Sequence, residues 1–382
     1  MLSMDLTRSL PSRIHARQDH VRAACNAILG SDHNWKSFSF YLTLQKLTVT
    51  ANATGLVGHD LGTDPRWLRA VQWYTVALAI GAYVSHSVPR PLRPVAALFA
   101  FLPAWAVYWY MAMLLRPKLA RDIREHQAAA EKGQLQDLLQ PSPDKSFPIT
   151  AWMISRTHPK QPTLSELTSR FIVASFEATA SSAVTICSVI TELATRPWLV
   201  EELREEISEV LKKDGQLPKT NLSELEKLDS VMKESARMNP FMYLALIRRV
   251  QKPVQLSIGP ELPAGSTLCV DAYHCYNSKK TWKHPEEFDP MRFYNLRRQP
   301  GQEMKHQFVG TGHDSPQWGD GPQACPGRFF ATNTLKILLV HLLMKYDFQF
   351  PPGAGKPHRI IFPNGSTTPE LTARIQFRRR QE

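Results

Sequence analysis

The sequence is poor in cysteine, in clustered charge and in uninterrupted apolar residues near its start. Five cysteines in 382 residues exclude a disulfide-stapled scaffold and suit a reducing compartment. Charged residues break every apolar run in the first thirty residues, which therefore do not resemble a secretory signal. The 46 Lys and Arg residues outnumber the 34 Asp and Glu residues, for a net charge of +12, without an RNA-binding, zinc-finger or homeodomain pattern. This dispersed charge favours an acidic protein partner or an anionic membrane over nucleic acid.

The hydrophobic pattern predicts a mainly α-helical chain with a small β-sheet, folded as a single domain over residues 1–382. Hydrophobic residues make up 43% of the chain and charged residues 21%, which is typical of a globular protein. Alternating apolar residues predict a β-hairpin over 250–272, polar residues predict a surface loop over 139–163, and the irregular stretch 277–326 is long enough to indicate a function. Apolar periodicity predicts helices over 15–135 with breaks near Gly30, Gly62 and 89–94, and over 164–194, 197–213, 222–238 and 327–346.

The longest uncharged segment runs over residues 95–115. Its 21 residues are enough for one membrane-spanning helix, which needs about 20. Pro103 should kink such a helix, and the aromatic residues gather in the second half of the segment instead of at both ends. Hydropathy alone leaves two interpretations open: a membrane-embedded helix, or a buried or interfacial helix pair of a large helical protein.

A cysteine flanked by glycines stands directly before the last predicted helix. The segment WGDGPQACPGRFFA covers residues 318–331, where Gly319, Gly321 and Gly327 permit tight turns and the close approach of another group to Cys325. A thiolate at a helix N-terminus is favoured by the helix dipole, so we expect Cys325 to ionise readily. The alternative is a buried structural cysteine near a helix cap, which is the commoner role of an isolated cysteine.

Two motifs upstream of Cys325 favour a functional thiolate over a buried structural cysteine. Glu234 and Arg237 form E-x-x-R on one helical face, close enough to pair, and FDPMRF follows with Arg292. E-x-x-R alone is weak evidence, because Glu201 and Arg204 form a second copy. The order E-x-x-R, D-P-x-R-F and then a glycine-flanked Cys-Pro-Gly is much harder to obtain by chance.

On these residues the sequence resembles the cytochrome P-450 family of haem-thiolate monooxygenases, and is most similar to its fungal secondary-metabolite branch. The resemblance is close from Leu164 to the C-terminus. It implies a mainly α P-450 fold that lacks part of the N-terminal region, and haem b with Cys325 as the axial thiolate ligand. The resemblance further implies that Glu234, Arg237 and Arg292 form a buried salt-bridge set that braces the loop carrying Cys325. It also implies a propionate partner at Arg248 (with Arg249 less favoured) and haem contacts at Trp318, Gly319 and Gly327.

The resemblance also assigns the helix 164–194 to the distal face of the haem. Most members carry an acid or amide followed by Thr at the centre of this helix, and these residues deliver protons to bound oxygen. Here the two positions are Ala180 and Ser181 within SFEATASSA. Ser181 keeps a hydroxyl group, and Glu177 lies one turn earlier on the same face, where it could replace the missing acid or serve as a surface carboxylate.

The implied function is insertion of one oxygen atom from O2 into an apolar, terpenoid-like metabolite, with electrons from an NADPH-dependent flavoprotein reductase. The implied location is the endoplasmic reticulum membrane with the domain facing the cytosol, where the sequons at Asn52, Asn221 and Asn364 stay unmodified. By the same resemblance, the chain is shorter than a full-length member of the family at its N-terminal end. The alternative is therefore a truncated, non-catalytic remnant or a membrane-bound interaction protein.

Overall fold

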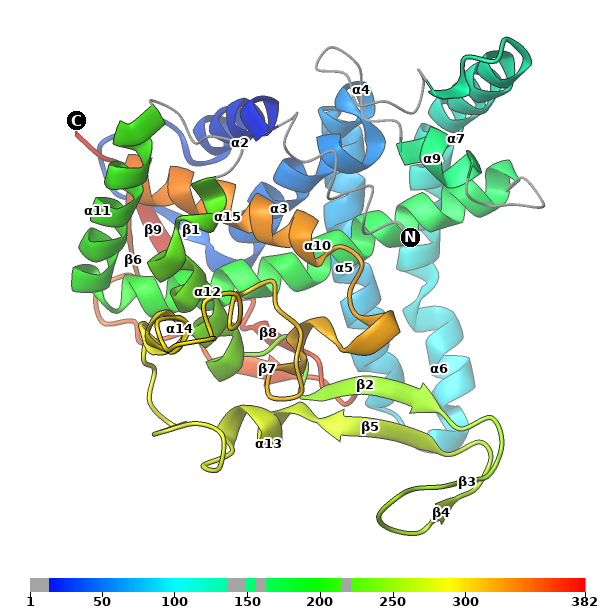
Figure 1. Cartoon of the computed structure of the whole chain (residues 1–382). Coiled ribbons are helices and arrows are strands. Elements are labelled where there is room, and N and C mark those ends of the chain that lie inside the picture. The colour runs from blue at the N-terminus through cyan, green and yellow to red at the C-terminus, as the bar shows by residue number, and fades with distance from the viewer. Residues whose placement is uncertain (1–13, 137–148, 156–162, 215–220, 382) are drawn as a thin grey trace.

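The computed structural model describes residues 14–136, 149–155, 163–214 and 221–381, and it is mainly helical (Figure 1). The first helices correspond to the region in which the sequence predicts helices with three breaks. The helices are α2 (Ile14–Leu29), α3 (Phe40–Val57), α4 (His59–Gly62), α5 (Pro65–His86), α6 (Arg93–Ala100), α7 (Leu102–Glu131), α9 (Ile149–Ser155), α10 (Leu164–Ala194), α11 (Pro197–Asp214), α12 (Glu226–Met238), α13 (Ala272–Asn277), α14 (Arg292–Arg297) and α15 (Arg328–Lys345).

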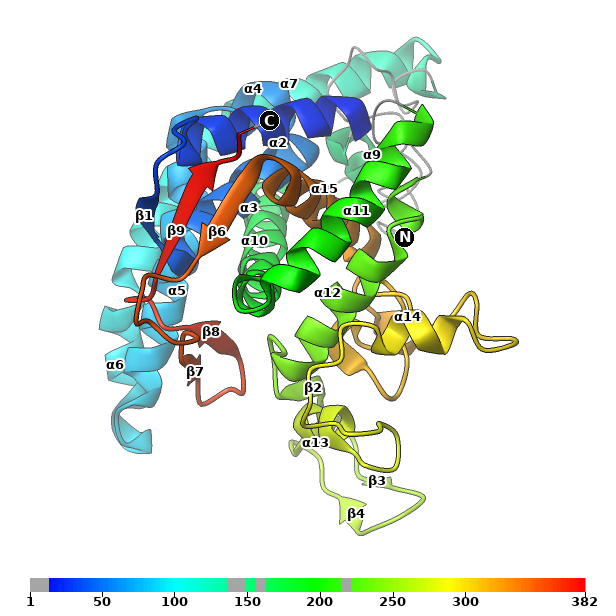
Figure 2. The same cartoon turned by 90° about the vertical axis from the view of Figure 1, so that its left-hand side faces the viewer.

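The helix α10 runs through the middle of the molecule and packs against α3, α5, α7, α12 and α15 (Figures 1 and 2). Its start is encoded locally: the Thr163 side chain accepts the backbone N–H of Glu166, and the Glu166 carboxylate accepts the N–H of Thr163. This capping box satisfies two of the N–H groups that a helix start leaves free. The apolar residues form two buried clusters, one toward α11, α12 and α15 and one toward α5 and α7, and both include residues of α3 and α10.

The predicted hairpin exists, but its long strands differ from the prediction. The strand β2 (Leu244–Arg249) pairs with β5 (Thr267–Asp271), while β3 (Val254–Gln255) and β4 (Glu261–Leu262) pair near the tip. The alternation that suggested a strand over 254–258 therefore belongs mostly to an exposed tip, where Ile258 is 83% exposed.

Short strands near both ends of the described chain form a second sheet that the sequence did not predict. Its order is β1 (Lys36–Ser39), β9 (Arg374–Arg379) and β6 (Tyr346–Gln349), and β7 (Arg359–Ile361) pairs with β8 (Thr367–Pro369) in a further hairpin. The predicted loop over 139–163 contains the short helix α9, and the rest of that prediction lies mostly outside the described residues.

The apolar segment 95–115 is divided between two helices. The helix α6 ends at Ala100 and α7 begins at Leu102, so the break precedes Pro103, which sits in the first turn of α7 where a missing N–H costs nothing. The break is packed tightly on α5, because a Cβ added to Gly81 would lie 2.7 Å from the Phe101 ring. By length and hydropathy, two helical stretches could cross a membrane, Arg90–Glu131 and Leu164–Ala194, and the second is mostly buried in the protein.

Candidate functional site

One cavity of about 360 Å³ brings together most of the residues that the sequence predicts around the haem. Its wall includes Ser181 from α10, Arg248 from β2, and Trp318, Gly319 and Cys325 from the irregular segment before α15. Most of the remaining lining is apolar, and the 240–247 segment makes the largest contribution to it. A larger groove of about 670 Å³ lies elsewhere, beside β6 and β9, and contains none of the predicted haem-site residues.

The backbone around Cys325 holds the thiol at the cavity wall. The Cys325 N–H donates to the Trp318 carbonyl at 2.6 Å, and the Arg328 guanidinium donates to the Cys325 carbonyl at 3.1 Å. Gly319 has a φ of +72°, and a Cβ there would lie 3.6 Å from Ala324, so the turn suits glycine. The loop therefore presents a half-buried sulfur directly before α15.

The expectation that Cys325 ionises readily does not hold for the protein alone. Burial raises the pKa of the Cys325 thiol above its usual value, while the N–H of Gly327 and the charge of Arg328 lower it by less. The N-terminus of α15 does favour the thiolate form of Cys325, but the desolvation of the buried sulfur raises the pKa by more. A bound metal ion deprotonates a coordinating thiol outright, so a thiolate here depends on coordination.

The two proton-delivery candidates occupy different places on α10. Ser181 lines the cavity, and its hydroxyl donates to the Glu177 carbonyl at 3.0 Å, which leaves the oxygen lone pairs free to accept. Glu177 is not among the lining residues and remains exposed on the helix surface. Enough protein surrounds its carboxyl group to raise the pKa of Glu177 by desolvation, so this group keeps its proton to a higher pH than an ordinary glutamate.

The remaining predicted haem contacts surround the same cavity with one exception. Arg248 is exposed at the cavity wall, whereas Arg249 is absent from the lining, so the geometry favours Arg248 of the two alternatives. The Trp318 indole N–H donates to the Phe308 carbonyl at 2.6 Å, and the two rings pack edge to face at 5.4 Å. Gly327 lies outside the lining and forms the N-cap of α15.

The three charged residues of the predicted brace meet in the interior. The Arg237 guanidinium donates to both Glu234 carboxylate oxygens, at 2.7 and 2.8 Å, and Arg292 Nε donates to the same carboxylate at 3.1 Å. Glu234 is fully buried and Arg237 nearly so. Both arginines also donate to backbone carbonyls of the 276–287 segment, including that of Glu287. Each charge is thus paired and hydrogen-bonded, which is the condition under which a buried ion pair is tolerable.

This brace does not touch the loop that carries Cys325. It fastens residues 276–292, and the cysteine loop is attached to α12 through Phe308, whose N–H donates to the Asp229 carboxylate at 2.7 Å. Asp229 also pairs with Lys336 at 2.6 Å, inside the core. The sequence did not single out Asp229, because a lone acid on a helix carries no signal of a partner 79 residues away.

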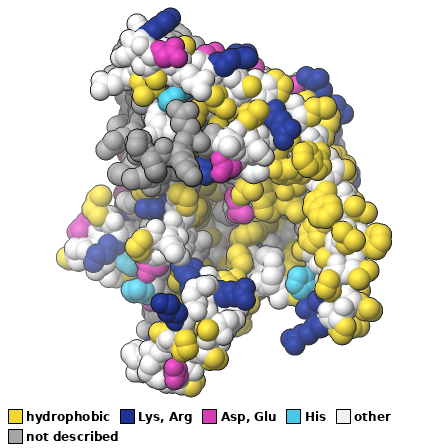
Figure 3. Space-filling model, turned by 90° about the vertical axis from the view of Figure 1, so that its right-hand side faces the viewer, with side chains coloured by type: hydrophobic (Ala, Val, Ile, Leu, Met, Phe, Trp, Pro, Cys, Tyr) yellow, Lys and Arg dark blue, Asp and Glu magenta, His cyan; other side chains and the backbone are white. Residues whose placement is uncertain are grey.

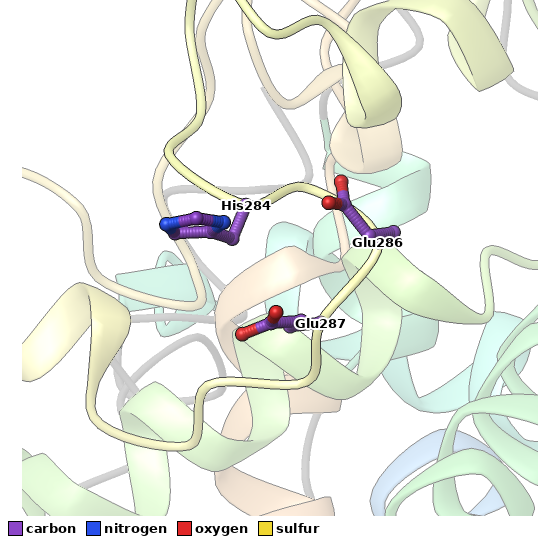
Figure 4. A group of neighbouring side chains, drawn as sticks. All are labelled: His284, Glu286 and Glu287. Atoms are coloured by element: carbon purple, nitrogen blue, oxygen red, sulfur yellow. The ribbon is translucent and has the colours of Figure 1, made fainter.

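The braced segment also carries three exposed side chains close enough to hold a metal ion. His284, Glu286 and Glu287 place potential ligand atoms within 4.8 Å of one another on the surface loop before α14 (Figure 4). Their backbone is held by Arg237 and Arg292, which accounts for the compact loop. Among the described residues this is the only such group, and Cys325 has no His, Cys, Asp or Glu companion of this kind.

The donor set around Cys325 fits haem better than a protein-only metal site. A zinc site needs three or four protein ligands, whereas haem supplies four nitrogens and takes one axial ligand from the protein. The single thiol provides one axial ligand, and the mostly apolar cavity provides space for the ring. The cationic Arg248 at the cavity wall provides a partner for a carboxylate. Among the described residues, the cavity lining contains no arginine besides Arg248 that could pair with the other propionate.

Comparisons with known proteins point the same way. The pattern of the family described as cytochrome P-450 matches residues 24–377. The chain is 40% identical to "Cytochrome P-450 monooxygenase ffsD" of Aspergillus flavipes, over 99% of this chain and 70% of that protein. It is 39% identical to "Pyrichalasin C-18 hydroxylase" of Pyricularia grisea, over 98% and 70% of the two chains. The structure resembles a cyanobacterial cytochrome P-450 solved with bound retinoic acid, with a TM-score of 0.72 and 19% identity over 98% of this chain and 76% of the other.

Proposed function

The chain belongs to the cytochrome P-450 family, whose haem iron is ligated by a cysteine thiolate, and on this premise we propose that it is a monooxygenase with Cys325 as the iron ligand. The observation that carries the proposal is that Cys325 and Ser181 line one cavity although they lie on different elements. When bound, thiolate-ligated haem supplies the activation of dioxygen that allows one oxygen atom to be inserted into a C–H bond.

The proposed substrate is an apolar, terpenoid-like secondary metabolite. Support comes from the mostly apolar 240–247 wall of the cavity and from fungal relatives, one of which is named a hydroxylase of pyrichalasin. Apolar walls exclude water and leave a few polar groups to orient the ligand. Here those groups include the hydroxyls of Ser181, Ser182 and Thr185 on α10.

The proposed role of Ser181 is to hold and pass a proton at the distal face of the cavity. Its hydroxyl donates to the Glu177 carbonyl. When the O–H bond rotates toward the cavity, the hydroxyl can give its proton to one water and take a proton from a second water, so it can relay a proton without a net change of charge. Ser182 lines the same cavity and can substitute in part. The Glu177 carboxyl group, whose raised pKa lets it keep its proton to a higher pH than usual, is the proposed source of the protons that Ser181 passes on.

Turnover with NADPH, a flavoprotein reductase and isotopically labelled dioxygen tests these roles together. The wild-type chain is expected to place one labelled atom in the product. Ser181→Ala should still bind haem and consume NADPH, but it should release hydrogen peroxide instead of product. We expect the yield per NADPH to fall toward the low end of the roughly 100- to 10,000-fold range of general acid–base catalysis, because Ser182 remains.

Glu177→Ala serves as the comparison variant. Full coupling in Ser181→Ala together with loss of coupling in Glu177→Ala would show that the proton route bypasses Ser181. A wild-type chain that binds haem through a thiolate but incorporates no label with any reductase would instead support the non-catalytic alternative.

The proposed membrane contact is a face made by α5, α6 and α7. Figure 3 shows hydrophobic side chains gathered over this side of the molecule, and Val95, Phe99, Trp109 and Met113 are each 60% exposed or more. Monomeric soluble proteins rarely expose an apolar patch of this extent. The other side of α7 packs against α5 and α10, which supports a helix that lies against the membrane over one that spans it.

These observations favour interfacial insertion over spanning. Arg90 and Arg93 stand beside the exposed apolar residues, where they can meet anionic lipid headgroups. The proposed setting is the cytosolic face of the endoplasmic reticulum, with the net charge of +12 also suiting an acidic reductase surface. Asn52 is buried and donates to the Ala178 carbonyl, so its side chain is closed to glycosylation on either side of the membrane. The expected absence of a glycan at Asn52 therefore fits the cytosolic setting but does not test it.

Replacing Phe99 by Glu should weaken binding to anionic vesicles by about 10- to 100-fold, since one buried aromatic side chain contributes about 1.5–3 kcal/mol. Trp198→Glu is the matched control, because Trp198 is 57% exposed on α11, far from α6 (Figure 1). Vesicle flotation measures both variants. Equal losses in the two variants would indicate charge repulsion alone, and wild-type protein that resists alkaline extraction would indicate a spanning helix.

A further inference from the structure

We infer that Lys233 and Asp229 on α12 form a clamp on the 307–308 peptide that positions Cys325 through Trp318. This inference rests on the proposed assignment of Cys325 as the iron ligand. It concerns residues other than the Glu234, Arg237 and Arg292 brace, which fastens a different segment of the chain.

The clamp grips one peptide from both sides. Lys233 Nζ donates to the Gln307 carbonyl at 3.0 Å, and the Asp229 carboxylate accepts the Phe308 N–H at 2.7 Å. Lys233 and Asp229 are 5% and 4% exposed, so both bonds lie away from water. Hydrogen bonds with one charged partner are roughly twice as strong as neutral ones, and burial preserves that strength.

The gripped peptide is linked directly to the cysteine. The Phe308 carbonyl accepts the Trp318 indole N–H at 2.6 Å and the Gln317 amide at 2.9 Å, and the Trp318 carbonyl accepts the Cys325 N–H at 2.6 Å. A displacement of the 307–308 peptide therefore reaches the cysteine backbone through two hydrogen bonds and the packed Phe308 and Trp318 rings. No comparable path runs from the Glu234 brace to Cys325 among the described residues.

The Lys233 ammonium group is held in the interior by the hydrogen bond to the Gln307 carbonyl and by a cation–π contact with Phe293. No carboxylate of the described residues lies within ion-pair distance of its Nζ, which sits 4.9 Å from the Phe293 ring centre. A buried lysine without an ion pair is costly, and burial lowers the pKa of Lys233 to about 8. Below that pH the ammonium group is charged and donates to the Gln307 carbonyl as a cation. A residue that serves only packing would be replaced by Met or Leu at no loss.

The test is a double-mutant cycle read on the reduced carbon monoxide complex of the haem-loaded full chain. Lys233→Met removes the donor at similar volume, and Trp318→Phe removes the indole donor while it keeps an aromatic ring. Lys233→Met should speed conversion of the thiolate-type band to the inactive band by about tenfold, because it removes one charge-assisted hydrogen bond. Trp318→Phe should speed the same conversion by about three- to tenfold, because it removes a neutral hydrogen bond. The double variant should be no faster than the faster single variant, because both act through the same peptide.

Ser230→Ala is the matched control on the same helix. The Ser230 hydroxyl donates to the Pro290 carbonyl and accepts the Tyr294 N–H, so it fastens another part of the irregular segment. This variant should lower the melting temperature and leave the band-loss rate within about twofold of wild type. The clamp would be refuted if the two single effects multiplied, so that the double variant lost the band about 30- to 100-fold faster than the wild type. It would also be refuted if Lys233→Met lost the band at the same rate as Ser230→Ala.

Two further outcomes keep the test decisive. If Lys233→Met yields no haem-loaded protein, Lys233→Arg should be haem-loaded and lose the thiolate-type band as slowly as the wild type. If Trp318→Phe loses the band at the wild-type rate, the path from the 307–308 peptide to Cys325 is refuted. A wild-type chain without any thiolate-type band refutes the proposed function instead, which separates that failure from failure of the clamp.

Discussion

Cys325→Ala is expected to eliminate thiolate ligation completely. The variant should retain little haem, and the haem that it does retain should show no thiolate-type Soret band in the reduced carbon monoxide complex. The physical reason is that Cys325 is the cysteine at the cavity wall, and no His, Cys, Asp or Glu of the described residues is grouped with it to replace the thiolate. Absorption spectra and haem content per chain measure the loss.

The other cysteines provide the controls for this prediction. Cys25 and Cys187 are buried, with burial raising the pKa of Cys25 to about 12, and both belong to the apolar core. Cys269 is exposed on β5, and Cys275 lies on α13 with a pKa that burial also raises. Alanine at any of these four positions should leave the thiolate-type band in place. If one of these four variants lost the thiolate-type band while Cys325→Ala kept it, the cysteine replaced in that variant would be the iron ligand.

Glu234→Ala is expected to prevent accumulation of folded, haem-loaded protein. The change leaves the guanidinium groups of Arg237 and Arg292 buried without their counter-charge, which costs about 3–5 kcal/mol. A loss of this size is a large part of the stability of an ordinary domain. Soluble yield, melting temperature and haem content should fall together, instead of turnover falling in a well-folded protein.

The chain contains its own control for that result. Glu201 and Arg204 repeat the E-x-x-R spacing on α11, but Glu201 is 63% exposed and Arg204 also binds Asp347 and two backbone carbonyls. Glu201→Ala should therefore cost less than about 1 kcal/mol, as surface ion pairs usually do. Normal haem content in Glu234→Ala with altered turnover would contradict the structural role of the brace.

Local signals in the sequence were sufficient to place the central helices. The predicted ranges 164–194, 197–213 and 222–238 place the starts of α10 and α11 and the end of α12 correctly, because helix caps and prolines act through neighbouring residues. The E-x-x-R pair is likewise local, since one helical turn separates its members. The motif order then led to Arg292, which the structure brings to the same carboxylate.

Features that depend on distant partners were not predictable. The strand β1 pairs Lys36 with Phe377, and a four-residue strand carries no periodicity that could reveal a partner so far along the chain. The contact from Asp229 to the Phe308 N–H fails for the same reason. For the protein without a bound metal, the ready ionisation of Cys325 was predicted wrongly, because helix position is visible in the sequence, whereas the burial that raises the pKa of the thiol is not.

The spectrum of the reduced, carbon monoxide-bound wild-type chain, purified with haem, tests the central assignment most directly. Because the assignment places a cysteine thiolate on the iron, it predicts a thiolate-type Soret band in a chain with one haem. A chain that binds no haem, or one that shows only the band of a haem protein without thiolate ligation, would contradict it.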